Sequence, residues 1–244
     1  MKQIVVSSLA EPVGSIWRAL QNNYTQIELF HIAAPLSSTP LPIYKWVIEN
    51  AESFHKWDKV RFVLMDEMVE RVKSAFSYVA LNDVASYEGF AKKTLLQQLE
   101  DKVKINIKII KPELSKIDTI EIPIDLLILA LGLQGNYANV MPNTSIEIGW
   151  HIAQLTSEFR QIHTHQGSKS FEGAHFREYG MSLGPQQVLN AKNVIVIVSG
   201  DKKRELTEQL FSYDSFHPEF PLSIIYHPIV ADKVEVFLTE DVLK

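Results

Sequence analysis

The stretch VIVIVSGDKKRELTEQLF, residues 194–211, joins an apolar run to a polar segment with helical periodicity. Val194–Val198 has the length and the unbroken apolar character of a parallel strand that is covered on both faces. Gly200 marks a turn, and Leu206 and Leu210 follow it at helical spacing. A buried strand, a turn and an amphipathic helix in this order are the repeating unit of α/β folds.

The same pattern recurs outward from this stretch in both directions. The predicted buried strands are Ile4–Val6, Ile27–Ala33, Val60–Met65, Ile105–Ile110, Leu126–Leu131 and Val194–Val198. Val234–Leu238 alternates in polarity, which is typical of an edge strand. The predicted helices are Pro40–Phe54, Tyr87–Leu99 and Lys202–Phe211. We therefore expect an α/β fold with a doubly wound, mostly parallel sheet in a Rossmann-like three-layer sandwich. Ligands of such sheets bind at the carboxyl ends of the strands.

The chain contains no internal repeat, low-complexity tract or linker that would divide it, so we expect residues 1–244 to form a single domain. Residues 157–177 differ from the rest, because they are polar and include His163, His165 and His175. This composition predicts a long loop or lid, which in a compact domain is often functional.

The composition of the chain argues against several classes of protein. The chain has 24 Lys and Arg against 29 Asp and Glu, a net charge of −5, which argues against a nucleic-acid binder. Cysteine is absent, so thiolate chemistry and Cys-ligated metals are excluded. No apolar run reaches the roughly 18 residues of a membrane span. The first residues show no signal peptide, so we expect a cytoplasmic protein without membrane partners.

Two segments combine a strand, polar turn residues and a helix start, which is the local arrangement of an anion site. Ser37-Ser38-Thr39-Pro40 follows one predicted strand, and Gly200-Asp201-Lys202-Lys203-Arg204 follows another. Free N–H groups and hydroxyls at a helix N-terminus bind anions, although the same residues also serve as plain helix caps. Three basic residues are unfavourable at the positive end of a helix, so they indicate an anionic partner.

A third segment, Met65-Asp66-Glu67-Met68, puts two carboxylates at the predicted carboxyl end of an apolar strand. Enzymes with α/β folds place catalytic groups there, and an acid that caps a helix or lies in a loop is the alternative.

Taken in chain order, these motifs resemble one known family. The set comprises Ser37-Ser38-Thr39-Pro40-Leu41-Pro42-Ile43-Tyr44, Met65-Asp66-Glu67, Ser86-Tyr87, Tyr179–Ala191, Gly200-x-x-Lys203 and His227-Pro228. It is similar to the phosphate loop, the Met-Asp-Glu-Tyr motif, the Ser-Tyr pair and the phosphate-binding lysine of glucosamine-6-phosphate deaminase/isomerases and 6-phosphogluconolactonases. The Met-Asp-Glu and Tyr179–Ala191 segments are closer to the deaminase branch.

The resemblance implies a role for each matching residue. Ser37, Ser38, Thr39 and Lys203 would bind the phosphate of a hexose or hexosamine 6-phosphate. Asp66 would move a proton between C1 and C2, with Glu67 beside it in the catalytic pair. We expect no cofactor, because no nucleotide-binding motif is present, and no metal, because no Asp or Glu spacing supports His151, His163, His165 and His175 as ligands.

The catalytic signature of the family, Gly-x-Asp-Gly-His with a Pro after it, is altered here. Its place reads Gly132-Leu133-Gln134-Gly135-Asn136, and Met141 stands where deaminases have a Glu. Gln and Asn do not exchange protons near neutral pH, so the acid–base groups that open the sugar ring are lost. We expect Gln134, Gly135 and Asn136 to line the sugar pocket.

Three functions stay open on these residues. The first is an isomerase or deaminase-like enzyme that acts on an open or easily opened sugar phosphate. The second is a sugar-phosphate sensor without turnover. The third is a divergent lactonase that uses His151 or a histidine of residues 157–177 as its base. Both a monomer and a homo-oligomer agree with the resemblance.

Overall fold

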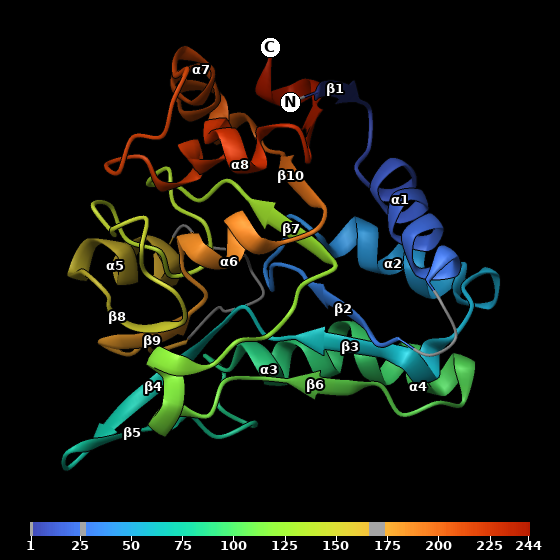
Figure 1. Cartoon of the computed structure of the whole chain (residues 1–244), viewed down its shortest axis with the longest axis horizontal. Coiled ribbons are helices and arrows are strands. Elements are labelled where there is room, and N and C mark those ends of the chain that lie inside the picture. Colours follow the sequence, from blue (N-terminus) through green and yellow to red (C-terminus); the bar gives the residue numbers. More distant parts are fainter. Residues whose placement is uncertain (1, 25–27, 166–173) are drawn as a thin grey trace.

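The computed structural model describes residues 2–24, 28–165 and 174–244, and a seven-stranded sheet runs through its centre (Figure 1). The strand order is β1-β11-β10-β7-β2-β3-β6, and every neighbouring pair is parallel. The strands are β1 (Lys2–Val6), β2 (Phe30–Ala33), β3 (Val60–Val63), β6 (Lys108–Ile110), β7 (Leu126–Ala130), β10 (Val194–Val198) and β11 (Val234–Thr239).

Helices cover both faces of this sheet (Figure 1). They are α1 (Ala10–Asn23), α2 (Leu41–Glu49), α3 (Tyr87–Ala91), α4 (Gln97–Val103), α5 (Ser157–His165), α6 (Pro185–Asn190), α7 (Arg204–Ser212) and α8 (Pro228–Ala231). A π-helical segment, Lys92–Leu96, joins α3 to α4. The helical prediction for Tyr87–Leu99 is thus confirmed, that for Pro40–Phe54 is shortened to Leu41–Glu49, and that for Lys202–Phe211 is shifted to Arg204–Ser212.

Alternate residues of the central strands belong to two different cores. Ile128 of β7 packs with α1 to α4, whereas Leu127 and Leu129 pack with α6, α7 and α8. All five residues of β10 are buried. A strand buried on both faces must be apolar throughout, which is why the sequence of Val194–Val198 predicts it so well. The α/β three-layer prediction is confirmed.

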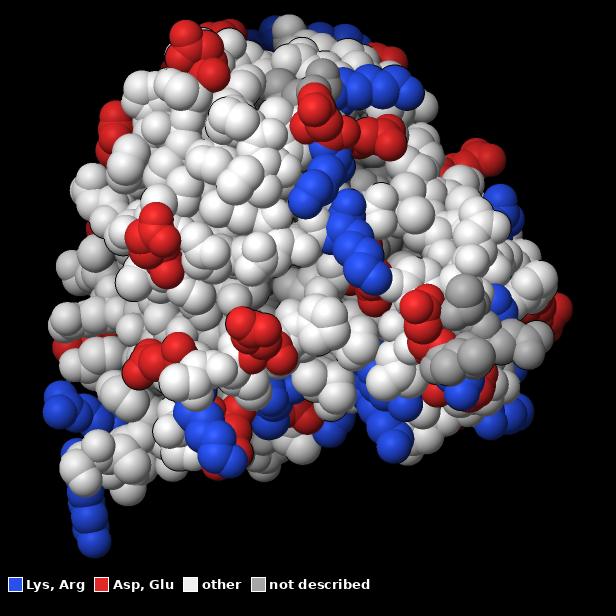
Figure 2. Space-filling view, viewed as in Figure 1, with Lys and Arg blue, Asp and Glu red and all other residues white. Residues whose placement is uncertain are grey.

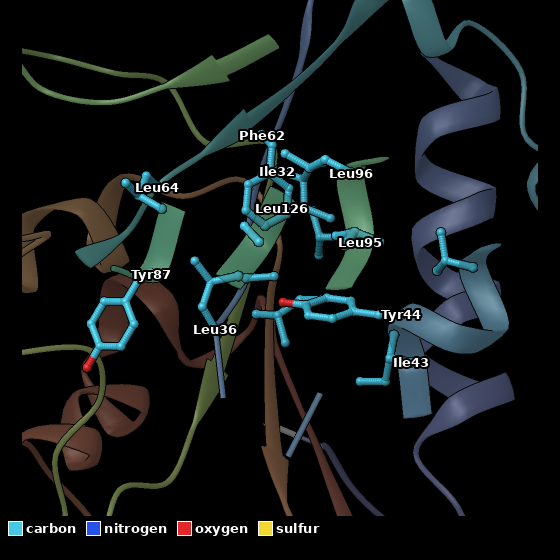
Figure 3. Close-up of a cluster of buried hydrophobic side chains, with 14 of the residues drawn as sticks. Ile32, Leu36, Ile43, Tyr44, Phe62, Leu64, Tyr87, Leu95, Leu96 and Leu126 are labelled. Atoms are coloured by element: carbon cyan, nitrogen blue, oxygen red, sulfur yellow. The ribbon is translucent and has the colours of Figure 1, made fainter. Parts of the chain in front are cut away.

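The core on the α2 side is shown close up in Figure 3. Ile32 of β2 and Phe62 of β3 meet Leu95 and Leu96 of the π-helical segment there, and all four are buried. Tyr44 also lies in this core, and its hydroxyl donates to the Pro35 carbonyl at 2.6 Å. This hydrogen bond fixes the segment after β2 against helix α2.

A second, antiparallel sheet stands beside the carboxyl ends of the main sheet. Its order is β5-β4-β9-β8, from β4 (Asp66–Val72), β5 (Ala75–Tyr78), β8 (His151–Gln154) and β9 (Tyr179–Ser182). The Met65-Asp66-Glu67 motif therefore does not end a parallel strand. Asp66 and Glu67 begin β4, and two residues separate β4 from the end of β3 at Val63.

The edge-strand prediction for Val234–Leu238 is wrong, because β11 lies between β1 and β10. The alternation that suggested an edge comes from Glu235, which is half-buried near the start of the strand, at the rim of the sheet. Strand β11 is not at the edge because β1, from the other end of the chain, pairs with it. No local sequence pattern predicts that pairing.

The prediction of a long loop at residues 157–177 is wrong for its first part, which forms helix α5. The Thr156 hydroxyl accepts the backbone N–H of Phe159 at 3.1 Å, as a helix cap does, and the Phe159 side chain is buried. The sequence carries this signal, a capping Thr followed by Glu158 in the first turn, but the polar composition obscures it. Residues 166–173 lie outside the described part of the chain.

Acidic and basic side chains are interspersed on the face drawn in Figure 2, with no continuous basic surface. Among the described helices, none is both long and apolar enough to cross a membrane.

Candidate functional site

A cavity of about 270 Å³ lies across the carboxyl ends of four adjacent strands. Its walls include Ser37–Thr39 after β2, Asp66 after β3, Gly132–Leu133 after β7 and Ser199–Lys203 after β10. Strands β2 and β7 are neighbours at which the chain order changes direction, since β3 and β6 continue on one side and β10 and β11 on the other. Such a switch point is where open α/β sheets bind their ligands. We call this cavity the inner cavity.

The loop between β2 and α2 forms one wall. Ser37, Ser38 and Thr39 all line the cavity, and Pro40 after them is buried. Helix α2 begins at Leu41, and the N–H groups of Leu41 and Ile43 are already bonded to the carbonyls of Ser38 and Pro40, so the hydroxyls of the loop are the groups that this wall offers to a ligand.

Lys203 stands on the opposite wall and reaches this loop. Its Nζ donates to the Thr39 Oγ1 at 3.4 Å, and it forms no ion pair with a described acidic residue. Burial lowers the pKa of Lys203 to about 8. A half-buried ammonium that has no counter-ion among the described residues is stabilised by a bound anion, and the oxygens of a phosphate would supply that negative charge.

The turn that carries Lys203 is fixed at its start by Gly200. Gly200 has a φ of 103°, which favours glycine, and its N–H donates to the Asp241 carboxylate at 3.0 Å. Residues from two distant parts of the chain therefore hold the Lys203 wall in place.

Asp66 lines the same cavity and is 8% exposed. Burial, together with the neighbouring Glu67 carboxylate, raises the pKa of Asp66 to about 8. No hydrogen bond to its side chain is found within the described residues. Asp66 is therefore a carboxylate with a pKa suited to general acid–base work and with its oxygens free for a ligand.

Glu67 does not line the inner cavity, since its side chain turns toward helix α3. Its carboxylate accepts four hydrogen bonds of 2.8–3.0 Å, from the backbone N–H groups of Met68, Tyr87 and Glu88 and from the Ser86 hydroxyl. Burial raises the pKa of Glu67, and these four donors oppose that rise. The arrangement makes Glu67 a residue that holds Tyr87 and Asp66 in position.

The altered signature forms a tight turn after β7, and the side-chain amide of Asn136 is hydrogen-bonded within this turn. Its Nδ2 donates to the Ala138 carbonyl at 3.0 Å, and its Oδ1 accepts the N–H of Gln134 at 3.3 Å. A side chain at position 132 would place its Cβ 2.1 Å from Asn136 Oδ1, so the glycine there is required. Asn136 lines the cavity, but the hydrogen bonds of its side-chain amide stabilise the turn.

Gln134 and Gly135, the other two residues expected at the sugar, do not line the inner cavity. The Gln134 Oε1 is buried without a hydrogen-bond partner in the described structure. Gly135 has a φ of 69° and lies against Phe220, where a Cβ would come within 2.5 Å of the ring.

Two tyrosines that were not expected at the site line the inner cavity, Tyr87 and Tyr137. In Figure 3 the Tyr87 hydroxyl points away from the apolar cluster. Burial, with the nearby Asp66 and Glu67, raises the pKa of Tyr87 well above its usual value, so the phenol stays neutral. The Ser86-Tyr87 pair was a usable signal for this residue, whereas Tyr137 stands in no motif.

None of the histidines whose side chains the structure describes lines the inner cavity. His151 begins β8, its Nδ1 lies 3.0 Å from the Gly149 carbonyl, and burial lowers its pKa. The side chains of His163 and His165 lie outside the described part of the structure, and His175 is exposed. Within the described residues, no three histidines or acidic side chains are grouped so as to hold a metal ion.

Similar solved structures share the fold over the whole chain. A monomeric glucosamine-6-phosphate deaminase superposes with a TM-score of 0.76 at 18% identity, covering 100% of this chain and 99% of that one. A 6-phosphogluconolactonase from Thermotoga maritima gives a TM-score of 0.65 at 15% identity over 98% of each chain.

Relatives similar in sequence include two bacterial glucosamine-6-phosphate deaminases. The protein from Halalkalibacterium halodurans is 29% identical over 114 residues, which is 45% of each chain. The protein from Oenococcus oeni is 25% identical over 205 residues, 83% of this chain and 81% of the relative. The sequence model of the glucosamine-6-phosphate isomerases/6-phosphogluconolactonase family matches residues 4–234. The chain therefore belongs to the glucosamine-6-phosphate isomerase/6-phosphogluconolactonase family.

Proposed function

We propose that this protein binds an open-chain hexose or hexosamine 6-phosphate and moves a proton between C1 and C2 of the sugar. One observation carries the proposal. A half-buried lysine with no counter-ion among the described residues and a carboxylate with a pKa of about 8 line the same cavity of about 270 Å³. The names of the relatives, several of which are glucosamine-6-phosphate deaminases, support the same substrate class.

The phosphate lies between the Lys203 ammonium and the loop of Ser37, Ser38 and Thr39. Lys203 and Thr39 are already in contact at 3.4 Å, so a phosphate that enters here meets a cation and the hydroxyls of the loop at once. Binding the phosphate positions the other end of the sugar toward Asp66.

Asp66 supplies the base. Its carboxylate takes the proton from C2 of an open-chain aldose, the electron pair of that C–H bond forms the C1–C2 double bond, and the π pair of the carbonyl moves onto the oxygen at C1, which gives an enediolate. The resulting carboxylic acid returns the proton to C1, while the hydroxyl proton at C2 passes to the oxygen at C1 and leaves a carbonyl at C2. A base with a pKa near the working pH accepts and returns a proton with similar ease.

The substrate is an open-chain form because none of the residues that replace the acid–base groups of the family signature, among the residues the structure describes, can open a sugar ring. The Asn136 amide is bound within its own turn, and Met141 packs against the apolar core. Neither side chain exchanges a proton with the ring oxygen or the anomeric hydroxyl.

The test is proton NMR in D₂O with glucosamine 6-phosphate, galactosamine 6-phosphate and fructose 6-phosphate. We expect deuterium to enter C1 or C2, and Asp66→Asn to slow this exchange by about 10²-fold or more, the usual contribution of a general base. Asp232→Asn, at an exposed position outside the cavity, is the matched control. Exchange that persists at the full rate in Asp66→Asn rules out the proposed base.

A sensor without turnover is the second candidate, and the internal hydrogen bonds of Asn136 favour it. In that case the sugar phosphates raise the melting temperature although no deuterium is incorporated. At about 100 times Kd, binding stabilises the fold by about 2.7 kcal/mol. The shift would disappear in Lys203→Met.

A further inference from the structure

The isomerisation proposed above needs two proton transfers, one between carbons and one between oxygens. Asp66 moves the proton between C1 and C2, whereas the hydroxyl proton at C2 still has to reach the oxygen at C1. The second carrier must both donate and accept a proton at an oxygen, and a neutral hydroxyl group does both. The carrier is therefore to be sought among the hydroxyl groups beside Asp66.

Tyr87 supplies such a hydroxyl in the wall of the inner cavity. It lines the cavity together with Asp66 and is 5% exposed. Its hydroxyl points away from the apolar cluster, whereas the Tyr44 hydroxyl donates to the Pro35 carbonyl (Figure 3). Burial raises the pKa of Tyr87, and the charges of Asp66 and Glu67 raise it further, so the phenol is neutral and lies near both carboxylates.

The backbone around Tyr87 is fixed relative to Asp66. The Tyr87 N–H donates to the Glu67 Oε1 at 2.9 Å, and Glu67 directly follows Asp66 in β4. The Ser86 hydroxyl donates to the Glu67 Oε2 at 3.0 Å and accepts the N–H of Gly89 at 3.0 Å, which caps α3. One buried carboxylate thus joins the start of α3 to the start of β4 and preserves the distance between the phenol and the proposed base.

Neighbouring groups of the cavity are less suited to this transfer. The Asn136 amide is bound within its own turn, and an amide does not exchange protons near neutral pH. Tyr137 is also buried, but burial alone raises its pKa, without a contribution from Asp66. Tyr87 is therefore the tyrosine of this cavity that lies nearer the proposed base.

We propose that Tyr87 carries the proton between the two oxygens of the enediolate. The inference rests on the proposed function, because Asp66 must first form the enediolate. The Tyr87 hydroxyl gives its proton to the negatively charged oxygen at C1 and becomes a phenolate. The phenolate takes the hydroxyl proton at C2, and the electron pair of that O–H bond forms the carbonyl at C2. The π pair of the C1–C2 double bond then takes the proton from Asp66 at C1, so both side chains return to their starting states.

The order of these steps favours the ionisation of Tyr87. Asp66 holds the proton from C2 at the moment when Tyr87 gives up its own. The negative charge of Asp66, which raises the pKa of Tyr87 in the resting site, is therefore absent at that moment. The phenolate and the Asp66 carboxylate never coexist.

The test follows the reverse reaction, from fructose 6-phosphate in D₂O, by proton NMR. Deuterium at C1 of the recovered ketose measures the enediolates that return, and the aldose 6-phosphate formed measures those whose oxygen proton has moved. We expect Tyr87→Phe to lower aldose formation by about 10²-fold or more, and to raise the ratio of C1 exchange to aldose formation by about tenfold or more.

The controls separate the hydroxyl from the ring. Tyr87→Phe keeps the ring whose centroid lies 6.4 Å from that of Phe176, so the packing of the site is retained. Tyr226→Phe removes a hydroxyl from a half-buried tyrosine outside the inner cavity, and it should leave both rates unchanged. Tyr87→Leu removes both the ring and the hydroxyl.

Three results overturn the inference. An unchanged ratio in Tyr87→Phe means that another group moves the proton between the oxygens. Normal rates in Tyr87→Phe with a loss in Tyr87→Leu mean that the ring serves for packing alone. Wild-type protein that exchanges C1 but forms no aldose has no transfer between oxygens, although Asp66 still acts as the base. Failure of the proposed function is distinct, since the wild type then shows no exchange at C1 at all.

Discussion

Asp66 and Lys203 give the inner cavity two groups that titrate in the same range but must be in opposite states. Burial and Glu67 raise the pKa of Asp66 to about 8, so its proton-accepting carboxylate increases as pH rises. Burial lowers the pKa of Lys203 to about 8, so its phosphate-binding ammonium decreases as pH rises. We expect kcat/KM for C1/C2 exchange to be bell-shaped, with its maximum close to pH 8.

The measurement is the initial exchange rate at low substrate concentration between about pH 6 and about pH 10. Lys203→Arg keeps a cation across this range, so it should lose the alkaline limb and keep the acid limb. A profile that is flat through this range would contradict the assignment of both groups.

At the scale of elements, the turn after β7 depends on a left-handed glycine. Gly135 has a φ of 69°, and a Cβ there would approach the Phe220 ring at 2.5 Å. Gly200 is also left-handed, at 103°, but a Cβ there meets nothing within 4 Å. A residue with a Cβ would be strained at both positions, but it would clash with a neighbouring side chain only at Gly135.

We therefore expect Gly135→Ala to lower the free energy of unfolding by about 2–4 kcal/mol, from strain and displacement of Phe220, and Gly200→Ala by only about 1–2 kcal/mol. Urea denaturation of both variants measures the difference. Equal losses would mean that Phe220 moves aside without cost.

How far the sequence predicts this structure depends on the element. Strand β10 is predicted over its full length, because a strand covered on both faces has to be apolar at each residue. The antiparallel sheet is missed, because β4 pairs with β9 more than a hundred residues away and neither strand has a strong pattern of its own. Local patterns report burial, whereas pairing between distant strands is decided by the fold.

The same distinction applies to the inner cavity. Ser37–Thr39, Asp66, Asn136 and Lys203 line it together, as the order of strands and motifs predicts. The directions in which the Asp66 and Glu67 side chains point could not be predicted, because the sequence did not show that a new strand begins at Asp66. Glu67 turns to the N–H groups of α3. Adjacent residues of a strand point to opposite faces, so a pair of carboxylates in sequence divides between two environments.

At the scale of the whole molecule, one buried carboxylate joins segments that are distant in the sequence. Asp125 is 2% exposed and accepts hydrogen bonds from the Tyr24 hydroxyl and the His31 backbone N–H, with Lys192 Nζ at 2.9 Å. It directly precedes β7, at the opposite end of the sheet from the inner cavity. Burial alone would raise the pKa of Asp125, but the bonds from His31, Lys192 and Tyr24 outweigh it and hold the pKa well below its usual value.

A lowered pKa means that the ionised Asp125 stabilises the fold above its unfolded pKa of about 3.9, and that this contribution is lost as pH falls below that value. We expect Asp125→Asn to cost about 3 kcal/mol at neutral pH, because the cluster keeps its cation but loses the charge that pairs with it. The penalty should shrink below about pH 4, where the wild type loses the same interaction. Urea denaturation across this range, with Asp232→Asn as control, measures it, and a penalty independent of pH would contradict the account.

The hydrogen bond from the Gly200 N–H to Asp241 has a consequence for the order of events during synthesis. Strands β2, β3 and β7 and the Ser37–Thr39 loop are complete in the nascent chain long before residue 241 has been added. Strand β11, which fills the place between β1 and β10, is also made late, and Asp241 follows it. A ribosome that has translated as far as Lys203 therefore carries every residue of the inner cavity, yet the turn that presents its lysine is still without its anchor. Ligand recognition in the growing polypeptide should thus begin only when the last strand of the sheet has left the exit tunnel.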